Sequence, residues 1–532
     1  MTEPTILTGG TVHLDATGSS AEAVGVRGGS VVAAGTPEEV AAALPGARRA
    51  DLDGRTVVPG LVESHVHPIF YGLTEGWVDG RSPRRGSVPE ILDALRAALP
   101  GLADGQWVRG WGYDHTSLAE GRHPTRDELD QVSTEVPVVL SHITAHFLVA
   151  NSRALELAGI RDDTPDPAEG RFVRGDDGRL TGLMWEMGAV NAVLAVVPPP
   201  APEDLTAAAE RALTLAASRG MTTVHDLATG IAAGPAELDA WEALDAAGRI
   251  PVRVAAYLRG DLLPAFLASR QFGTGDRFAV HGAKFWSDGS IQGLSAALTA
   301  PYACAHDVTG DMLFSLEELV HLVATVDAAG GQAAVHANGD RAIRTVVEAF
   351  AAVRAAGCRP GARHRVEHLQ MASPEDLAAL VEAGGVASVF ANHVYWWGDK
   401  HRDVFLGQER AARIDPLVDV VASGLHFGLH SDCPVTPMDA LRTLWTAVTR
   451  RTSGGAVLGP EQRITPAQAL HALTADSAYL IGAESHSGTL HPGMDADLAV
   501  LETDVLAVDP EELEHVAVAA TMVGGDWVFG GV

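Results

Sequence analysis

Two histidines close a mainly apolar stretch near the start of the chain. Residues 55–67 read Arg-Thr-Val-Val-Pro-Gly-Leu-Val-Glu-Ser-His-Val-His, so His65 and His67 are two positions apart. Side chains at i and i+2 of a β-strand point to the same face, which would direct both imidazoles at one spot. Neutral imidazole is the commonest metal ligand among side chains, and zinc accepts nitrogen and oxygen donors. Alone the pair is weak evidence, because His-x-His also occurs by chance.

Four further residues with suitable chemistry follow later apolar segments. They are Lys284, His336, His368 and Asp432. With the first pair, they supply four imidazoles, one carboxylate and one amine. If each were only a packed or solvated residue, six separate coincidences would be needed. A shared metal site is therefore the favoured interpretation, provided that the fold brings the segments together.

The middle of the chain alternates between strand and helix patterns. After the strand that ends at His67, further strands are predicted at 221–226, 252–258, 279–285, 332–336, 363–368, 385–390 and 427–432. Helical patterns cover 205–218, 236–247, 262–270, 315–328, 341–356, 374–383, 417–422 and 466–480. Eight β-then-α units predict an α/β fold, a parallel (β/α)8 TIM barrel, whose chemistry lies at the carboxyl ends of its strands.

Both ends of the chain predict short strands joined by tight turns. Residues 23–27 and 31–34 flank Gly-Gly-Ser, and residues 521–523 and 527–529 flank Gly-Gly-Asp. We therefore expect a small β-sandwich domain built from 1–60 plus 487–532, around a barrel of 61–486. Residues 71–200 are too many for a βα loop and end in a proline-rich linker. They predict a large inserted subdomain after the first barrel strand, within the barrel.

Composition narrows the class of protein. The 532 residues include 38 basic and 68 acidic side chains, which give a net charge of −30. This sign disfavours nucleic acid and anionic membranes as partners. No apolar run approaches the length of a membrane span, and the first residues lack the features of a signal peptide. The three cysteines are widely separated, which favours a reducing, cytoplasmic setting. Abundant Ala, Gly, Asp and Arg with little Lys suggests a GC-rich bacterial genome.

The series of motifs resembles the amidohydrolase superfamily of metal-dependent hydrolases. Within it, the branch typified by N-substituted formamide deformylases is the most similar. The matching motifs are at 59–67, 110–114, 124–130, 145–155, 336–342, 364–368 and 493–498, so the resemblance covers nearly the whole chain. It implies hydrolysis of a carbon–nitrogen amide bond in a small molecule, with N-substituted formamides as the nearest family substrate.

The resemblance also implies roles for the six residues named above. His65, His67, His336 and His368 would be metal ligands, and Lys284 would be a carboxylated lysine that bridges two metals. A free ammonium repels cations and only donates hydrogen bonds, so a lysine among ligands makes sense only if its charge is reversed. One or two Zn2+ ions are expected. Asp432 would bind the metal or its water and act as general base and then general acid.

Substrate contacts are expected from the insertion and from the later loops. The candidates are His146, Glu186, Trp286, Asp288, His393 and Trp396, with Tyr395 and Trp397 beside the last. By resemblance, His146 would polarise a carbonyl or hold a substrate group. For His146 and Glu186 a structural role is the alternative, and core packing is the alternative for the aromatic residues. Cys433 is expected to be a packed neighbour of Asp432.

Other functions stay open at this level. Cyclic amides, N-acyl amino acids or an amidine ring are alternative substrates for the same chemistry. A non-catalytic barrel that binds a metal or a small ligand is the alternative from another class. The resemblance implies a homodimer as one candidate oligomeric state.

Overall fold

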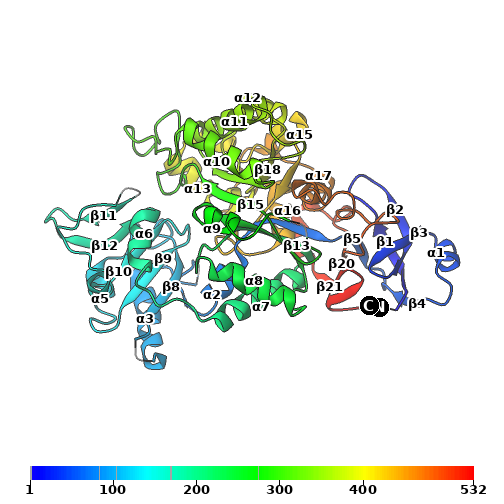
Figure 1. Cartoon of the computed structure of the whole chain (residues 1–532), viewed down its shortest axis with the longest axis horizontal. Helices are drawn as coiled ribbons and strands as arrows, with labels where there is room; N and C mark the ends of the chain where they lie inside the picture. Colours follow the sequence, from blue (N-terminus) through cyan, green and yellow to red (C-terminus); the bar gives the residue numbers. More distant parts are fainter. Residues whose placement is uncertain (1–2, 83, 104, 168–169, 274) are drawn as a thin grey trace. The chain divides into compact units, whose positions relative to one another are not determined.

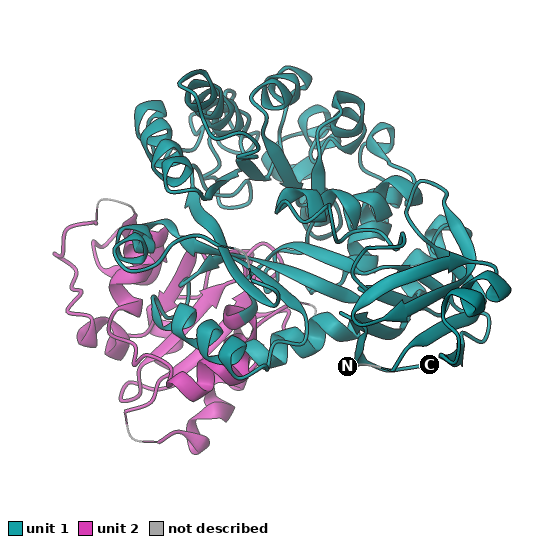
Figure 2. Ribbon diagram, turned by 45° about the vertical axis from the view of Figure 1, so that its right-hand side comes forward, with its two compact units in different colours: residues 1–68, 209–532 teal, residues 69–208 magenta. Residues whose placement is uncertain are grey.

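The computed structural model of the chain describes residues 3–82, 84–103, 105–167, 170–273 and 275–532 (Figure 1). The chain divides into two compact units, residues 1–68 with 209–532 and residues 69–208 (Figure 2). Within the described ranges, every helix is too short or too polar to span a lipid bilayer.

Eight parallel strands form the barrel of the first unit. In pairing order they are β6 (Leu61–Val66), β13 (Met221–Thr229), β14 (Arg253–Arg259), β15 (Phe278–Trp286), β16 (Gln332–Ala337), β17 (Arg365–His368), β18 (Val386–Val389) and β19 (Phe427–Leu429). Past β19, the Asp432 N–H donates to the His65 carbonyl over 3.1 Å, and the His67 N–H donates to the Cys433 carbonyl over 2.9 Å. These bonds bring the last strand back to the first, so the sheet nearly closes. The predicted parallel α/β barrel is confirmed.

Helices follow the strands as the sequence predicts. They are α7 (Pro202–Ser218), α8 (Ala236–Ala246), α9 (Leu263–Leu267), α10 (Leu316–Ala328), α11 (Asp340–Ala355), α12 (Pro374–Glu382) and α15 (Leu417–Ser423). In α11, Ile343, Val346, Phe350 and Val353 are buried. Their spacing of three or four residues places them on one helix face, which packs inward. Ser315 caps α10, in a capping box with Glu318.

The single helix predicted at 466–480 is wrong. The structure has two helices there, α17 (Pro466–Ala472) and α18 (Ala475–Leu480). Between them, Thr474 has φ −131° and ψ −91°, outside the helical region. Its hydroxyl donates to the Leu470 carbonyl over 2.7 Å and so satisfies a group at the end of α17. The apolar pattern continues across the break, which is why periodicity alone did not reveal it.

The loops after β18 and β19 carry helices that the strand–helix pattern did not predict. These are α13 (Asn392–Lys400), a π-helical turn at His401–Phe405, α14 (Gln408–Ala412) and α16 (Ala440–Thr449). The residues Tyr395, Trp396 and Trp397 therefore lie on a helix.

Both ends of the chain contribute strands to a second sheet of the first unit. Its order is β22 (Asp526–Phe529), β21 (Val518–Val523), β20 (Leu498–Leu501), β5 (Thr56–Pro59), β1 (Thr5–His13), β2 (Ser20–Arg27) and β3 (Ser30–Gly35), and β4 (Arg48–Asp51) pairs with β1. Val500 of β20 pairs with Val57 of β5 in the antiparallel ladder that joins the two ends. Leu7, Val24 and Leu498 are buried in its core.

The second unit contains a mixed sheet of its own. The order is β11 (Arg171–Arg174), β12 (Leu180–Trp185), β10 (Phe147–Ala150), β9 (Val138–His142), β8 (Val108–Tyr113) and β7 (Val78–Asp79). β7, β8 and β9 are parallel neighbours, whereas β9 and β10 are antiparallel. The helices α3 (Val88–Ala98), α5 (Ser152–Leu157) and α6 (Met187–Leu194) accompany it.

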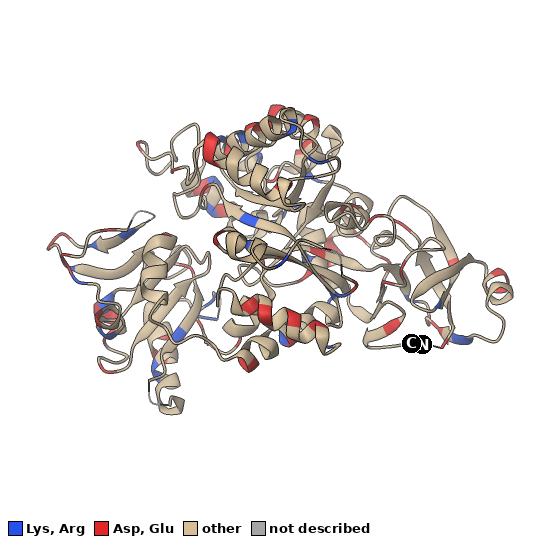
Figure 3. Cartoon of the chain, in the orientation of Figure 1, with Lys and Arg blue, Asp and Glu red and all other residues tan. Residues whose placement is uncertain are grey.

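Acidic side chains are frequent on the exposed helix faces, as the net charge of −30 requires (Figure 3). On α8, for example, Asp239, Glu242 and Asp245 are exposed, whereas Leu238, Trp241 and Leu244 on the opposite side are buried. This is the ordinary pattern of a helix that covers a barrel.

Candidate metal centre

The carboxyl ends of the barrel strands bring the six predicted residues together. His65 lies in β6, Lys284 in β15, His336 in β16 and His368 at the end of β17, and all four side chains are buried. His67 follows β6 directly. Asp432 lies three residues beyond β19, in the segment that pairs with β6. Parallel strands end on the same side of the barrel, so the side chains converge.

His65, His67 and Asp432 form one group of donors. Oδ1 of Asp432 lies 3.4 Å from Nε2 of His65 and 3.2 Å from Nε2 of His67. Ligand atoms around one tetrahedral zinc ion, at bond lengths of about 2.0–2.1 Å, lie roughly 3.3–3.5 Å apart. The spacing of these three atoms therefore fits a shared divalent ion.

The hydrogen bond on the far side of the His65 ring fixes its tautomer. Nδ1 of His65 lies 2.6 Å from Oε2 of Glu367, and a carboxylate oxygen only accepts. Nδ1 therefore carries the proton, and the lone pair on Nε2 points toward Asp432. Burial lowers the pKa of His65 well below its usual range, which keeps the ring neutral. A carboxylate that orients a ligand histidine in this way is a common feature of metal sites.

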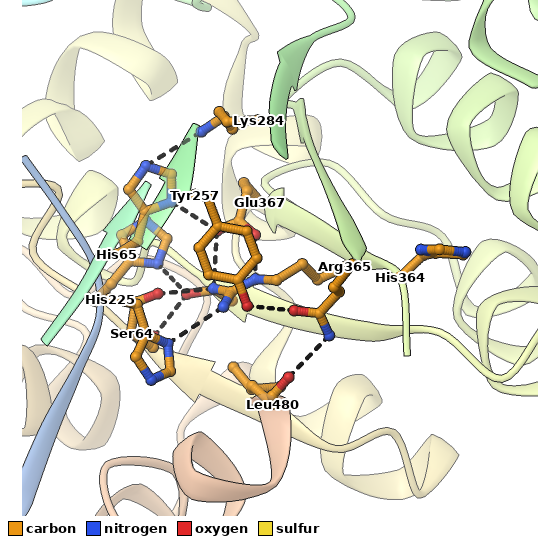
Figure 4. Close-up of polar contacts among 12 residues, drawn as sticks. Ser64, His65, His225, Tyr257, Lys284, His364, Arg365, Glu367 and Leu480 are labelled. Atoms are coloured by element: carbon orange, nitrogen blue, oxygen red, sulfur yellow. Dashed lines mark hydrogen bonds and ion pairs between the residues drawn. The ribbon is translucent and has the colours of Figure 1, made fainter. Parts of the chain in front are cut away.

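A buried arginine holds Glu367 in place (Figure 4). The Arg365 guanidinium donates to both carboxylate oxygens of Glu367 and, over 2.7 Å, to the Ser64 carbonyl. It also lies 3.2 Å from Nδ1 of His225. Arg365 and Glu367 are completely buried. They form a buried charge pair, and its carboxylate fixes the orientation of the His65 ring.

A chain of hydrogen bonds fixes His368 in the same manner. The Ser64 hydroxyl donates to the Leu429 carbonyl, so it must accept from the Ser388 hydroxyl 2.7 Å away. Ser388 then accepts from Nδ1 of His430, also over 2.7 Å. The remaining lone pair of His430, on Nε2, accepts from Nδ1 of His368 over 3.1 Å.

This order of donors leaves the lone pair of His368 on Nε2, the nitrogen available to a metal. His430 therefore orients His368. His430 is also within ligand distance of His65 and His368, but its two nitrogens are already engaged in the chain.

Nε2 of His336 lies 3.0 Å from the carbonyl oxygen of Gly289 and 3.1 Å from Nδ2 of Asn338. Donation from Nε2 to the carbonyl leaves the lone pair of His336 on Nδ1. Asp288 supports the same loop. Its carboxylate is fully buried and accepts backbone N–H bonds from Ala297, Asn338 and Gly339. These bonds give Asp288 a role in holding the loops, and its role in substrate binding stays a prediction.

Lys284 lies deep among these groups. Its side chain is 1% exposed, and Nζ donates to Nε2 of His65 over 3.3 Å. Burial lowers the pKa of Lys284 to about 8, below its usual range. Nζ also lies 5.3 Å from the centre of the Trp286 ring, whose side chain is half-buried.

Two other predicted contacts belong to the helix that follows β18. His393 and Trp396 are one turn apart on α13. Nδ1 of His393 lies 3.1 Å from Oδ1 of the buried Asp415, and the His393 ring lies 6.4 Å from the ring of His368. Trp396 packs edge to face against Tyr395. The structure thus places His393 beside a predicted ligand, whereas Trp397 is buried among His393 and Phe390.

His146 and Glu186 lie in the second unit and pair with each other. Nδ1 of His146 is 2.7 Å from Oε2 of Glu186, and the Glu186 N–H donates to the His146 carbonyl over 2.9 Å. Glu186 has φ 64° and Ala145, next to His146, has φ 62°. Such left-handed backbone is costly for residues other than glycine, and it often marks functional positions.

Sequence reasoning did not identify Glu367, Arg365, His430 or Ser388. A signal was available for three of them. Arg365 and Glu367 stand at alternate positions of a strand predicted to be buried, where apolar residues are the rule. His430 precedes Asp432 by two positions. The hydrogen bonds through which these residues orient His65 and His368 include contacts between strands hundreds of residues apart in the sequence. A local sequence pattern does not reveal such contacts.

The family model for the amidohydrolase family matches residues 49–529. The chain belongs to this family. The N-substituted formamide deformylase of Arthrobacter pascens is 29% identical over 96% of this amidohydrolase and 95% of its own length. The putative amidohydrolase YtcJ of Bacillus subtilis (strain 168) is 27% identical over 96% of both chains. Protein LONG AFTER FAR-RED 3 of Arabidopsis thaliana is 28% identical over 98% of this chain and 91% of its own.

Solved structures of similar fold carry the description of metal-dependent hydrolases. The amidohydrolase resembles an uncharacterized metal-dependent hydrolase from Pyrococcus horikoshii OT3 with a TM-score of 0.78 and 25% identity, covering 96% of this chain and 99% of the other. A second one, from Pyrococcus furiosus, gives a TM-score of 0.75 at 25% identity, covering 94% and 100%. Family, fold and donor groups together support a hydrolase that uses a metal ion.

Proposed function

We propose that the protein is a metal-dependent hydrolase that cleaves the carbon–nitrogen bond of a small amide, with N-substituted formamides as the first substrates to test. One observation carries the metal dependence. The lone pair on Nε2 of His65 and the carboxylate oxygen Oδ1 of Asp432 face each other over 3.4 Å. Two acceptors at this distance need a cation beside them. The Lys284 ammonium, 3.3 Å from Nε2 of His65, can supply it, and a metal ion would take its place once Lys284 is carboxylated. The similarity to a formamide deformylase supports the choice of substrate.

The residues present fit one or two zinc ions. His65, His67, His336, His368 and Asp432 would hold the metal, and nitrogen and oxygen donors of this kind suit Zn2+. When bound, a divalent ion would supply Lewis acidity, which lowers the pKa of water and polarises a carbonyl group.

Lys284 would be carboxylated. Nζ loses one proton from the ammonium, forms a bond to the carbon of CO2 and loses a second proton, so the release of two protons changes the charge of the side chain from +1 to −1. The carbamate oxygens would then join the donors, since Nζ already lies 3.3 Å from Nε2 of His65. This modification replaces a buried cation, which would compete with a metal, by a ligand.

Asp432 would move the proton in hydrolysis. Its side chain is 13% exposed, and its Oδ1 receives no hydrogen bond of good geometry within the described part of the chain. It would accept a proton from the attacking water and pass it to the leaving nitrogen. Trp286, His393 and Trp396 would contact the substrate, and a substrate-binding role for His146 and Glu186 stays a prediction.

The wider organisation is part of the proposal. Residues 1–60 plus 487–532 would form a β-sandwich domain, and residues 71–200 a subdomain inserted after the first barrel strand. A small amide would be the physiological partner, in a cytoplasmic enzyme, with a homodimer as a candidate oligomeric state.

Removal of metal tests the proposed function. The protein is treated with a chelator, dialysed, and assayed for formate release from a panel of N-alkylformamides, before and after Zn2+ is returned. We expect formate release to disappear on removal and to recover on addition. If cyclic amides or N-acyl amino acids are hydrolysed instead, in a metal-dependent manner, the protein is still a metal-dependent hydrolase but the proposed substrate class is wrong. Bound metal without turnover of any amide would favour a binding barrel.

A further inference from the structure

A second group of metal-binding side chains lies in the sheet of the second unit. β8 and β9 are parallel neighbours, and Tyr113 at the end of β8 pairs with His142 at the end of β9. Asp114 and His115 follow β8 directly. Because parallel strands end at the same edge of a sheet, Asp114, His115 and His142 meet there. All of them lie within residues 69–208, the second unit, and none is among the barrel donors named above.

The donor atoms of these three residues lie close to one another. Nδ1 of His115 is 3.1 Å from Nε2 of His142, and Nε2 of His142 is 3.9 Å from Oδ1 of Asp114. One ligand atom from each residue lies within 4.8 Å of the other two. These separations bracket the roughly 3.3–3.5 Å between ligands of a tetrahedral zinc ion. The separation between Asp114 and His115 is at most 4.8 Å, so side-chain shifts of up to about 1 Å would bring all three to a shared ion.

Neighbouring groups hold two of the donors in position. The N–H and hydroxyl groups of Thr116 donate to Oδ1 of Asp114 over 2.9 and 2.8 Å. Nδ1 of His142 accepts the Thr144 backbone N–H over 3.2 Å and lies 2.9 Å from the Thr144 hydroxyl, so without metal the ring proton lies on Nε2. A metal at Nε2 would shift that proton to Nδ1, where the Thr144 hydroxyl can accept it. Hydrogen bonds of this kind orient the ligands of many metal sites.

The ring of His123 supports the third donor. It stacks on His115 with 3.9 Å between the ring centres, and the Tyr113 hydroxyl lies 2.8 Å from Nδ1 of His123. The plane of the His115 ring is therefore held by stacking on His123.

Burial and charge at this edge suit a cation. His142 is fully buried, and burial lowers its pKa well below the usual range, so it stays in the neutral form that binds metals. Asp114 contributes a negative charge and is 13% exposed. His115 is half-buried. An ion can therefore reach the group from solvent, and water can complete its coordination.

We propose that Asp114, His115 and His142 bind a divalent transition-metal ion, Zn2+ in the first instance. Two imidazoles and a carboxylate are donors that Zn2+ accepts and that hard cations such as Mg2+ do not favour. The ion would join the ends of β8 and β9. Its three ligands all belong to the second unit, and the proposal does not depend on the proposed hydrolysis.

Zinc content measured on the full chain tests this site. The wild type, His115→Ala, Asp114→Asn and His67→Ala are dialysed against micromolar Zn2+ and analysed for zinc per chain. His306→Ala, at an exposed histidine of the first unit, is the matched control. We expect His115→Ala and Asp114→Asn each to hold one zinc ion fewer than the wild type, and His306→Ala to hold the same number. His67→Ala should lose zinc from the barrel site. The double variant His67→Ala with His115→Ala should hold one zinc ion fewer than His67→Ala alone.

Equal zinc content in the wild type, His115→Ala and Asp114→Asn would overturn the proposal. The three residues would then be a hydrogen-bonded cluster in which the Nε2–H of His142 donates to His115. Anomalous X-ray scattering at the zinc edge, from zinc-soaked wild-type crystals, needs no variant. A peak among the three side chains would support the site, and its absence would refute it even if a variant failed to fold.

Discussion

Asp432→Asn is expected to lower turnover of the hydrolysed amide by about 10²–10⁴-fold while the protein keeps its metal, since this is the usual contribution of a positioned general acid–base group. Asparagine has nearly the same size and retains an oxygen that can face His65 and His67, which lie 3.4 and 3.2 Å away. It cannot accept a proton from water, however, or deliver one to the leaving nitrogen. The measurement is the rate of formate release at saturating substrate, together with metal per chain.

Two variants control for this loss. Asp245→Asn makes the same chemical change on the exposed face of α8 and should leave turnover unchanged. Cys433→Ala removes the buried thiol beside Asp432 and should also retain most activity. If turnover survives Asp432→Asn but disappears in Cys433→Ala, the reaction uses a thiol nucleophile. That result would contradict the proposed role of the Asp432 carboxylate.

The second large effect is expected from the buried charge pair. Glu367→Leu leaves the Arg365 guanidinium completely buried without its carboxylate, and loss of one partner of such a pair typically costs about 3–5 kcal/mol in free energy of unfolding. The same variant removes the acceptor that orients His65, so metal affinity should fall by about 10–100-fold. Denaturant unfolding measures the first effect, and competition with a chelating dye measures the second.

A double variant separates the two effects. Arg365→Met with Glu367→Leu replaces both charges by apolar groups, so most of the lost stability should return, because no buried charge is left unpaired. Metal affinity should stay low, because His65 still lacks its acceptor. Glu210→Ala, which removes an exposed partner of Arg249, should cost less than about 1 kcal/mol. A single Glu367→Leu variant as stable as this control would show that the pair has no structural importance.

The sequence predicted the barrel well because its signals are local. Each strand is a short apolar run followed by a helix with apolar residues every three or four positions, and parallel order follows from the alternation. The ligand positions follow from the same rule, since His336, His368 and Lys284 stand at or near strand ends. The break at Thr474 was missed because the apolar pattern on either side continues unchanged.

The groups that orient the ligands could not be predicted in the same way. Glu367 reaches His65 across 302 positions of sequence. The chain from Ser64 through Ser388 and His430 to His368 depends on hydroxyl groups that look ordinary in a sequence. The cluster of Asp114 with His142 depends on the parallel pairing of β8 and β9, and two strands alone do not reveal whether they pair or in which direction. Pairing between distant strands is the information that local patterns lack.

Metal per chain, measured by elemental analysis, tests the central claim most directly. The protein is produced with zinc and bicarbonate in the His115→Ala background, so that only the barrel site is counted, and it is compared with Lys284→Ala in the same background. We predict two zinc ions per chain, with a loss of at least one when Lys284 is removed. One ion that is unaffected by Lys284→Ala would contradict the bridging carbamate. A chain without metal would contradict the metal-dependent hydrolase itself.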